Sequence, residues 1–190
     1  MPKDLHTDAS FEHQDYTITR LPDADYEACR FLHCNFAGTD LSGINFTECE
    51  FDHCNLSSAK IIQTTFNDVK FISSKMLGLH FETANAFLFT VRFDGCTLDL
   101  SSFYQCRMKK TVFNNCSLQE TDFTETILTE AVFSGCNLRD ARFEQTVLEK
   151  ADLRTAIHYS IDPEINKIHK AAFSYPAVLR LLDKYAITVS

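Results

Sequence analysis

Large apolar residues recur every five positions along most of this chain. One run extends from Leu21 to Phe81, and a second extends from Leu88 to Leu153. A small or compact residue mostly lies two positions before each of them, and all 8 cysteines occupy that place. A period of five fits neither an α-helix, with 3.6 residues per turn, nor a strand, with an alternation of two. The pattern therefore predicts a repeat protein whose function lies on the outside of a rod.

A chain that turns a corner after each pentapeptide closes a square coil in four repeats. Successive coils then stack at the spacing of β-strands, roughly 4.7–4.9 Å. This geometry predicts that residues twenty positions apart are neighbours, and outward charges of alternating sign agree with it. Three such columns are Arg20, Asp40, Lys60; Arg30, Glu50, Lys70; and Lys110, Glu130, Lys150.

The repeat resembles that of the pentapeptide-repeat family. The segments NLRDA, DLRTA and DLSGI are close to the A(D/N)LXX signature of that family, and the resemblance covers about residues 11–155. It implies an all-β fold, a right-handed quadrilateral β-helix with a C-terminal helical cap. We expect a β-helix over residues 1–155 with a phase break near 82–90, and a cap and dimerisation segment over residues 156–190.

The five-residue period slips between Phe81 and Leu88, which are seven positions apart. The pattern makes Leu88 the inward residue, so Phe87 and Phe89 are expected to point outward. We expect the solenoid to bulge or bend between residues 76 and 90. The two phenylalanines then either fold over a local kink or form an apolar contact with a partner.

The repeat is expected to stop after Leu153. Asp162 and Pro163 are typical of a helix start and predict a short helix to about Ile168. A second helix is expected from about residue 175, followed by a strand over 187–189. Spacing of i, i+3, i+4 and i+7 places four apolar side chains on one helix face. The predicted dimer interface is Val178, Leu181, Leu182, Tyr185 and Ile187; the alternative is a monomeric cap over the open end of the solenoid.

Composition and charge narrow the classes of function. The formal net charge is −8, which argues against direct binding of nucleic acid through clustered Lys and Arg and permits binding to a basic protein surface. No apolar run is long enough to span a membrane, the start lacks a signal-peptide core, and the bacterial cytoplasm is the expected compartment. Cysteines five apart, without a Cys-x-x-Cys pair, predict packed thiols and no metal site. Scattered histidines and 5 glycines indicate no catalytic group, no phosphate loop and no cofactor, so we expect no enzyme activity.

Two columns pair like charges, because Glu48 lies under Asp68 and Glu120 lies under Asp140, with Asp122 near the second pair. Stacked carboxylates cost free energy. They form either a solvated acidic face or a surface that meets a partner.

The tail YSIDPEINKIHKAAFSYPAVLRLLDKYAITV resembles the C-termini of the topoisomerase-protecting branch of the family. That branch includes Qnr, MfpA and the self-resistance proteins of albicidin and microcin producers. The resemblance implies a homodimer, joined through its C-terminal segment, that mimics DNA, binds DNA gyrase or topoisomerase IV and protects it from poisons.

On this hypothesis the acidic residues face gyrase, and Phe87 and Phe89 make an apolar contact. The chain lacks the extended loops of Qnr, which favours protection against a natural poison over strong quinolone protection. The alternative function is a generic protein-interaction scaffold with no topoisomerase role.

Overall fold

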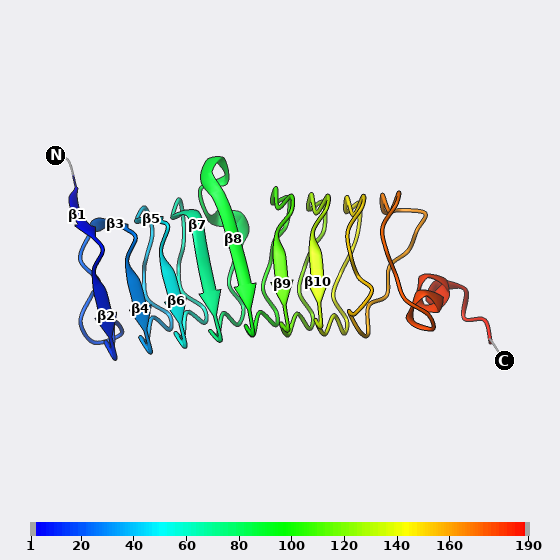
Figure 1. Cartoon of the computed structure of the whole chain (residues 1–190), viewed down its shortest axis with the longest axis horizontal. Coiled ribbons are helices and arrows are strands. Elements are labelled where there is room, and N and C mark those ends of the chain that lie inside the picture. Colours follow the sequence, from blue (N-terminus) through cyan, green and yellow to red (C-terminus); the bar gives the residue numbers. More distant parts are fainter. Residues whose placement is uncertain (1–2, 189–190) are drawn as a thin grey trace.

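The computed structural model describes residues 3–188 and shows a rod of stacked coils (Figure 1). Ten short strands lie along it: β1 (Asp4–Thr7), β2 (Ser10–Glu12), β3 (Ala24–Glu27), β4 (Arg30–Leu32), β5 (Asn45–Thr47), β6 (Glu50–Asp52), β7 (Thr65–Ile72), β8 (Phe89–Asp94), β9 (Val112–Asn114) and β10 (Val132–Ser134). Three 3₁₀ helices complete the description: η1 (Phe81–Thr83), η2 (Ala86–Leu88) and η3 (Ala177–Tyr185).

Each strand pairs in parallel with the equivalent strand of the next coil. Phe31 lies opposite Phe51, and after the break Phe93 lies opposite Phe113, so one coil takes twenty residues. The charge columns lie where they were predicted. Arg30 forms an ion pair with Glu50 at 3.0 Å. Glu130 forms ion pairs with Lys110 at 3.7 Å and with Lys150 at 3.4 Å. The predicted quadrilateral β-helix is confirmed.

The interior consists of columns of side chains that stack from coil to coil. Phe93, Phe113 and Phe133 lie face to face with centroids 5.1 and 5.0 Å apart. A neighbouring column meets this one edge to face, as Phe103 does with Phe113 at 6.0 Å and 80°. Both arrangements are favourable for aromatic rings, and they fill the interior. The solenoid therefore encloses a core and no channel.

Polar side chains at the small positions donate hydrogen bonds to backbone carbonyls of the preceding coil. Thr64 donates to the carbonyl of Leu41 at 2.8 Å, and the Cys49 thiol donates to that of Tyr26 at 3.3 Å. All eight cysteines are free and buried, as predicted for packed thiols. Burial raises the pKa of Cys49 to about 12, which keeps its hydrogen in place as a donor.

The corners of the coil use the left-handed region of the backbone, a feature that the sequence pattern did not predict. Glu48, Lys110 and Glu120 have φ values of 53°, 61° and 55°. Non-glycine residues adopt this region infrequently. Here the corner amide gains a bond to the next coil, as when Glu48 N–H donates to the carbonyl of Asn67 at 2.8 Å. Side chains at these corners point away from the core and are free to vary.

The break between the two runs is a longer coil, and it corrects one expectation. Val69 pairs with Val91 and Phe66 with Phe89, with a register shift between the two pairs, which confirms the predicted bulge. Phe89, and not Leu88, turns inward, where its ring contacts those of Phe66 and Phe81 at 6.4 and 5.9 Å. Leu88 is 44% exposed. The helices η1 and η2 take up the extra residues and rotate Phe89 into the column of rings.

The coils continue past residue 155, where the sequence placed the end of the solenoid. Val147 pairs with Lys167, and Asp152 pairs with Ala172. Asn166 fills a small position: its amide donates to the carbonyl of Phe143 at 2.8 Å and accepts from Thr146 N–H at 2.9 Å. Further coil, and not a cap, therefore follows Leu153.

The tail differs from its prediction in two elements. The helix expected from Asp162 to Ile168 is wrong, because this segment forms turns that continue the coil. The second helix is present as η3. Ile187 and Thr188 form no strand, and Val189 lies outside the described residues.

The stacked core predicts a large cost for removing one interior ring. Phe113 is fully buried in the middle of its column, so Phe113→Ala should lower the free energy of unfolding by about 3–5 kcal/mol. Ile62→Ala, at a side chain that is 54% exposed, should change it by less than about 0.5 kcal/mol. Guanidinium denaturation followed by circular dichroism measures both. Equal effects of the two variants would contradict the assignment of the core.

Candidate interaction surface

Each coil has four faces and four corners, and the predicted acidic residues are located relative to these. Glu48 and Asp68 lie at one corner, two positions after the buried Phe46 and Phe66. The strand pairs Val69–Val91 and Arg92–Val112 align the coils on the two sides of the break. This alignment places Lys110 and Glu130 at the same corner as Glu48 and Asp68.

Glu120 and Asp140 lie half a coil away from that corner. Half of a square coil is the diagonal, so the two acidic pairs lie at opposite corners. Asp122 lies beside Glu120, in a column between Ser102 and Arg142. The structure therefore unites the members of each pair but does not bring the five predicted carboxylates to one surface.

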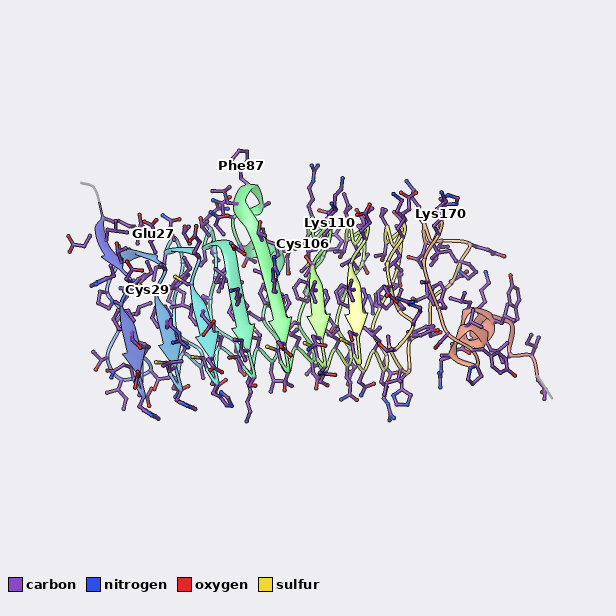
Figure 2. The ribbon with its side chains drawn as sticks, viewed as in Figure 1. Glu27, Cys29, Phe87, Cys106, Lys110 and Lys170 are labelled. Atoms are coloured by element: carbon purple, nitrogen blue, oxygen red, sulfur yellow. The ribbon has the colours of Figure 1, made fainter. Side chains whose placement is uncertain are left out.

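The loop that holds Phe87 projects from the side of the rod (Figure 2). Phe87 is 89% exposed at this loop. The loop is anchored through Asn85, whose side chain accepts a hydrogen bond from Phe87 N–H at 3.1 Å and donates to the hydroxyl of Thr65 at 3.2 Å. Of the two predicted contact phenylalanines, Phe87 is available at the surface, whereas Phe89 belongs to the core edge.

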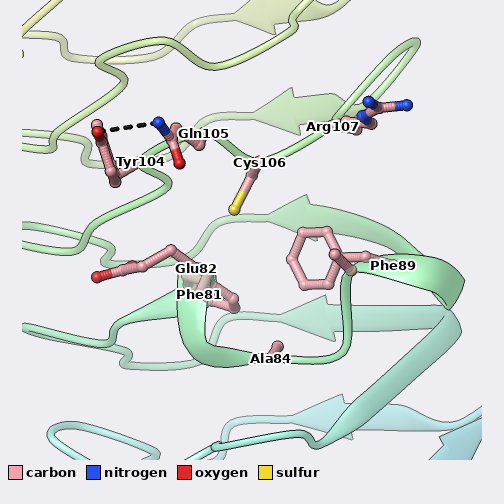
Figure 3. Close-up of a pocket in the computed structure, with 9 residues that line it drawn as sticks. Phe81, Glu82, Ala84, Phe89, Tyr104, Gln105, Cys106 and Arg107 are labelled. Carbon is pink, nitrogen blue, oxygen red and sulfur yellow. Dashed lines mark hydrogen bonds between the residues drawn. The ribbon is translucent and has the colours of Figure 1, made fainter.

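A recess of about 290 Å³ lies between this loop and the next coil (Figure 3). Cys106 and Phe89 point into it. Glu82 places Oε1 2.9 Å from His80 Nδ1, while its buried Oε2 has no hydrogen-bond partner among the described residues. Burial, with the charge of Glu82, raises the pKa of Cys106 to about 12, so this thiol stays protonated. The recess can accept a hydrogen-bond donor but presents no activated nucleophile.

Histidines share a third corner. The rings of His13 and His33 stack with centroids 4.9 Å apart, and those of His33 and His53 lie 5.0 Å apart. His53 Nδ1 lies 2.7 Å from Asp52. Over residues 3–188 no group of three or more His, Cys, Asp or Glu side chains is arranged to hold a metal ion.

The C-terminal helix η3 divides its apolar residues between the core and the solvent. Ala177 and Leu181 pack against the last coils, and Val178 is half-buried. Leu182, Tyr185 and Ile187 are 37%, 52% and 56% exposed, so three of the five predicted dimer residues point outward.

Ion pairs fasten this helix to the solenoid. Lys184 Nζ lies 2.8 Å from Asp162 and 2.6 Å from Glu164, and the hydroxyl of Tyr185 donates to Glu164 at 2.7 Å. Hydrogen bonding to Lys184 lowers the pKa of both carboxyls below their ordinary values. The contact is therefore strongest when both carboxyls are ionised.

This linkage predicts an acid-sensitive cap. A carboxyl with a lowered pKa stabilises the folded state above its ordinary pKa, near 4, and that contribution is lost as the pH falls through the folded value. The melting temperature of the wild type should fall between pH 5 and pH 3, and Lys184→Ala should reduce that fall. Lys109→Ala, at an exposed side chain with no ion pair among residues 3–188, is the control. An unchanged pH profile in the Lys184 variant would contradict the linkage.

Comparisons with known proteins match this architecture. A model described as pentapeptide repeats (8 copies) matches residues 29–68, and a model described as a pentapeptide repeat region matches residues 84–160. No curated protein matches the chain. No helix within residues 3–188 is long and apolar enough to cross a membrane.

Solved structures are similar in fold. A trypsin-treated variant of QnrB1, a plasmid-mediated fluoroquinolone resistance protein, superposes with a TM-score of 0.63 at 14% identity, with 100% of both chains covered. HetL, a pentapeptide repeat protein involved in heterocyst differentiation regulation from the cyanobacterium Nostoc sp. strain PCC 7120, gives a TM-score of 0.55 at 17% identity, covering 92% of this chain and 86% of that one. Both likenesses concern the fold.

Proposed function

This chain belongs to the pentapeptide-repeat family, and from that premise we propose that it binds DNA gyrase or topoisomerase IV as a DNA mimic and protects the enzyme from topoisomerase-poison antibiotics. The observation that carries the proposal is a filled, acidic rod that displays stacked carboxylates and one projecting apolar loop. The likeness in fold to a fluoroquinolone resistance protein supports it. Such a protein would act in the bacterial cytoplasm, in resistance or in self-immunity.

The physical basis is the resemblance of two charged rods. B-DNA carries one negative charge per about 1.7 Å of its axis. The corner pair Glu48 and Asp68 repeats carboxylates at the spacing of coils, and the chain has a net charge of −8. A surface built to attract duplex DNA would attract such a rod, and the attraction should weaken as salt is added.

A second function, that of a scaffold for a regulatory protein, is favoured by the likeness to HetL. The repeat itself serves either function. Under the scaffold function, neither topoisomerase inhibition nor rescue would be observed.

We extend the proposal to a homodimer formed through η3. The exposed residues Leu182 and Tyr185 of η3, with Ile187 just after it, supply an apolar surface that the solenoid leaves uncovered. A two-fold dimer through this surface would join two rods end to end.

The dimer predicts a mass near twice 21.7 kDa in multi-angle light scattering. Leu182→Glu together with Ile187→Glu should reduce it to that of one chain, because charge would be buried in an apolar contact. Leu100→Glu, at a corner that is 59% exposed and equivalent to that of Glu120, should stay dimeric. A monomeric wild type would contradict the dimer.

Topoisomerase protection predicts rescue of supercoiling. Purified protein should restore DNA supercoiling by gyrase in the presence of albicidin, a microcin or a fluoroquinolone, because it would compete at the poisoned enzyme–DNA complex. Agarose-gel assays over a wide range of protein concentration measure this, with heat-unfolded protein as the control. Neither rescue nor inhibition, with gyrases from several bacteria, would contradict the proposal and favour the scaffold.

A further inference from the structure

One face of the rod carries opposite charges on its two halves. This loop face consists of residues 4–8, 24–28, 44–48 and 64–68, then the loop, then residues 106–110, 126–130, 146–150 and 166–170, as the strand pairs and coil bridges align them. The first four segments contain no Lys or Arg and six carboxylates, at Asp4, Asp8, Asp25, Glu27, Glu48 and Asp68. The last four contain six basic residues, at Arg107, Lys109, Lys110, Lys150, Lys167 and Lys170, against Glu130 and Glu149.

The two halves meet at the loop of Phe87. Figure 2 shows Glu27, Phe87, Lys110 and Lys170 in this order along one side of the rod. The surface is therefore acidic, then apolar, then basic along the axis. An arrangement of this kind defines a direction, which a uniformly acidic rod does not have.

Most of these charges are not neutralised within the chain. Among residues 3–188, Glu27, Glu48 and Asp68 form no ion pair, and neither do Arg107 and Lys167. On the basic half, Glu130 neutralises part of the charge of Lys110 and Lys150. Opposite charges on a partner can therefore engage both halves.

Nucleic acid and a second copy both fit this face poorly. The phosphates of nucleic acid would meet six carboxylates on the first half. Two copies that pair antiparallel would match acid with base, but their loops would meet at the centre, because Phe87 projects from the middle of each face. The occupant needs a pocket at that point.

We propose that the loop face docks a protein that is basic opposite residues 24–68, has an apolar pocket for Phe87, and is acidic opposite residues 107–170. The inference rests on the proposed function, in which the basic part is the DNA-binding surface of the topoisomerase. Like charges opposed across an interface disfavour binding, so the two halves fix the orientation of the rod on its partner. The diagonal corner of Glu120 and Asp140 faces away from the partner.

Two matched pairs of variants test which corner meets the partner. Glu48→Lys with Asp68→Lys alters the loop face, and Glu120→Lys with Asp140→Lys alters the diagonal corner. All four residues are exposed and left-handed, and Lys110 and Lys150 already adopt that conformation, so both variants should fold. Both double variants change the net charge by the same amount. A difference in their binding therefore cannot come from the net charge of the chain.

Binding is measured by biolayer interferometry on immobilised DNA gyrase holoenzyme. The loop-face pair should weaken binding by about tenfold or more, and the diagonal pair by less than about threefold. Arg107→Glu with Lys167→Glu, and separately Phe87→Ser, should each weaken it as well. Melting temperatures and circular dichroism of all variants confirm that they fold.

The outcomes are distinguishable. Weakening by the diagonal pair alone would overturn the docking face and leave the proposed function standing. Absence of wild-type binding to DNA gyrase and, in the same assay, to topoisomerase IV would overturn both. Duplex DNA bound by the wild type and lost in the Arg107 and Lys167 variant would replace the protein partner with nucleic acid. Dimers at low salt that Phe87→Ser dissociates would instead identify a second copy as the occupant.

Discussion

The coil-to-coil register is the constraint on which the rest of this structure depends. Each coil donates and accepts backbone hydrogen bonds at strand spacing, so its interior residue must lie directly over the one before it, as Phe113 lies over Phe93 at 5.1 Å. A ring at that position fills the interior without distorting the ladder. The same filling removes any internal cleft, which confines recognition to the faces and corners.

The longer coil shows what happens when this constraint meets extra residues. The interior column must continue, and Phe89 enters it against Phe66 and Phe81. Because no space is left inside, η1 and η2 carry the surplus backbone outward and Phe87 with it. The projecting loop and the recess beside Cys106 thus have one physical cause.

The sequence predicted the features that the five-residue period controls. It missed those that depend on which of several neighbouring side chains packs into the core. Twenty-residue coils and the column of Glu50 follow from spacing alone. Leu88 and Phe89 are both apolar, and contacts with distant rings decide between them. Asn166 escaped notice because a polar side chain fills a small position only when backbone partners satisfy its amide. The sequence could not place the two acidic pairs relative to each other, because corner identity cannot be followed through a break of unknown register.

Corner side chains point away from the core, so their charge does not affect its packing. The corner of Glu48 carries two different charge patterns along its length. Beyond the loop, Glu130 lies between Lys110 and Lys150, an alternation that stabilises the rod itself. Before the loop, Glu48 and Asp68 are stacked with no cation in their column to offset the repulsion. Under the proposed function, a positively charged partner bound at this corner would offset the repulsion that the stacked carboxylates cost the folded chain.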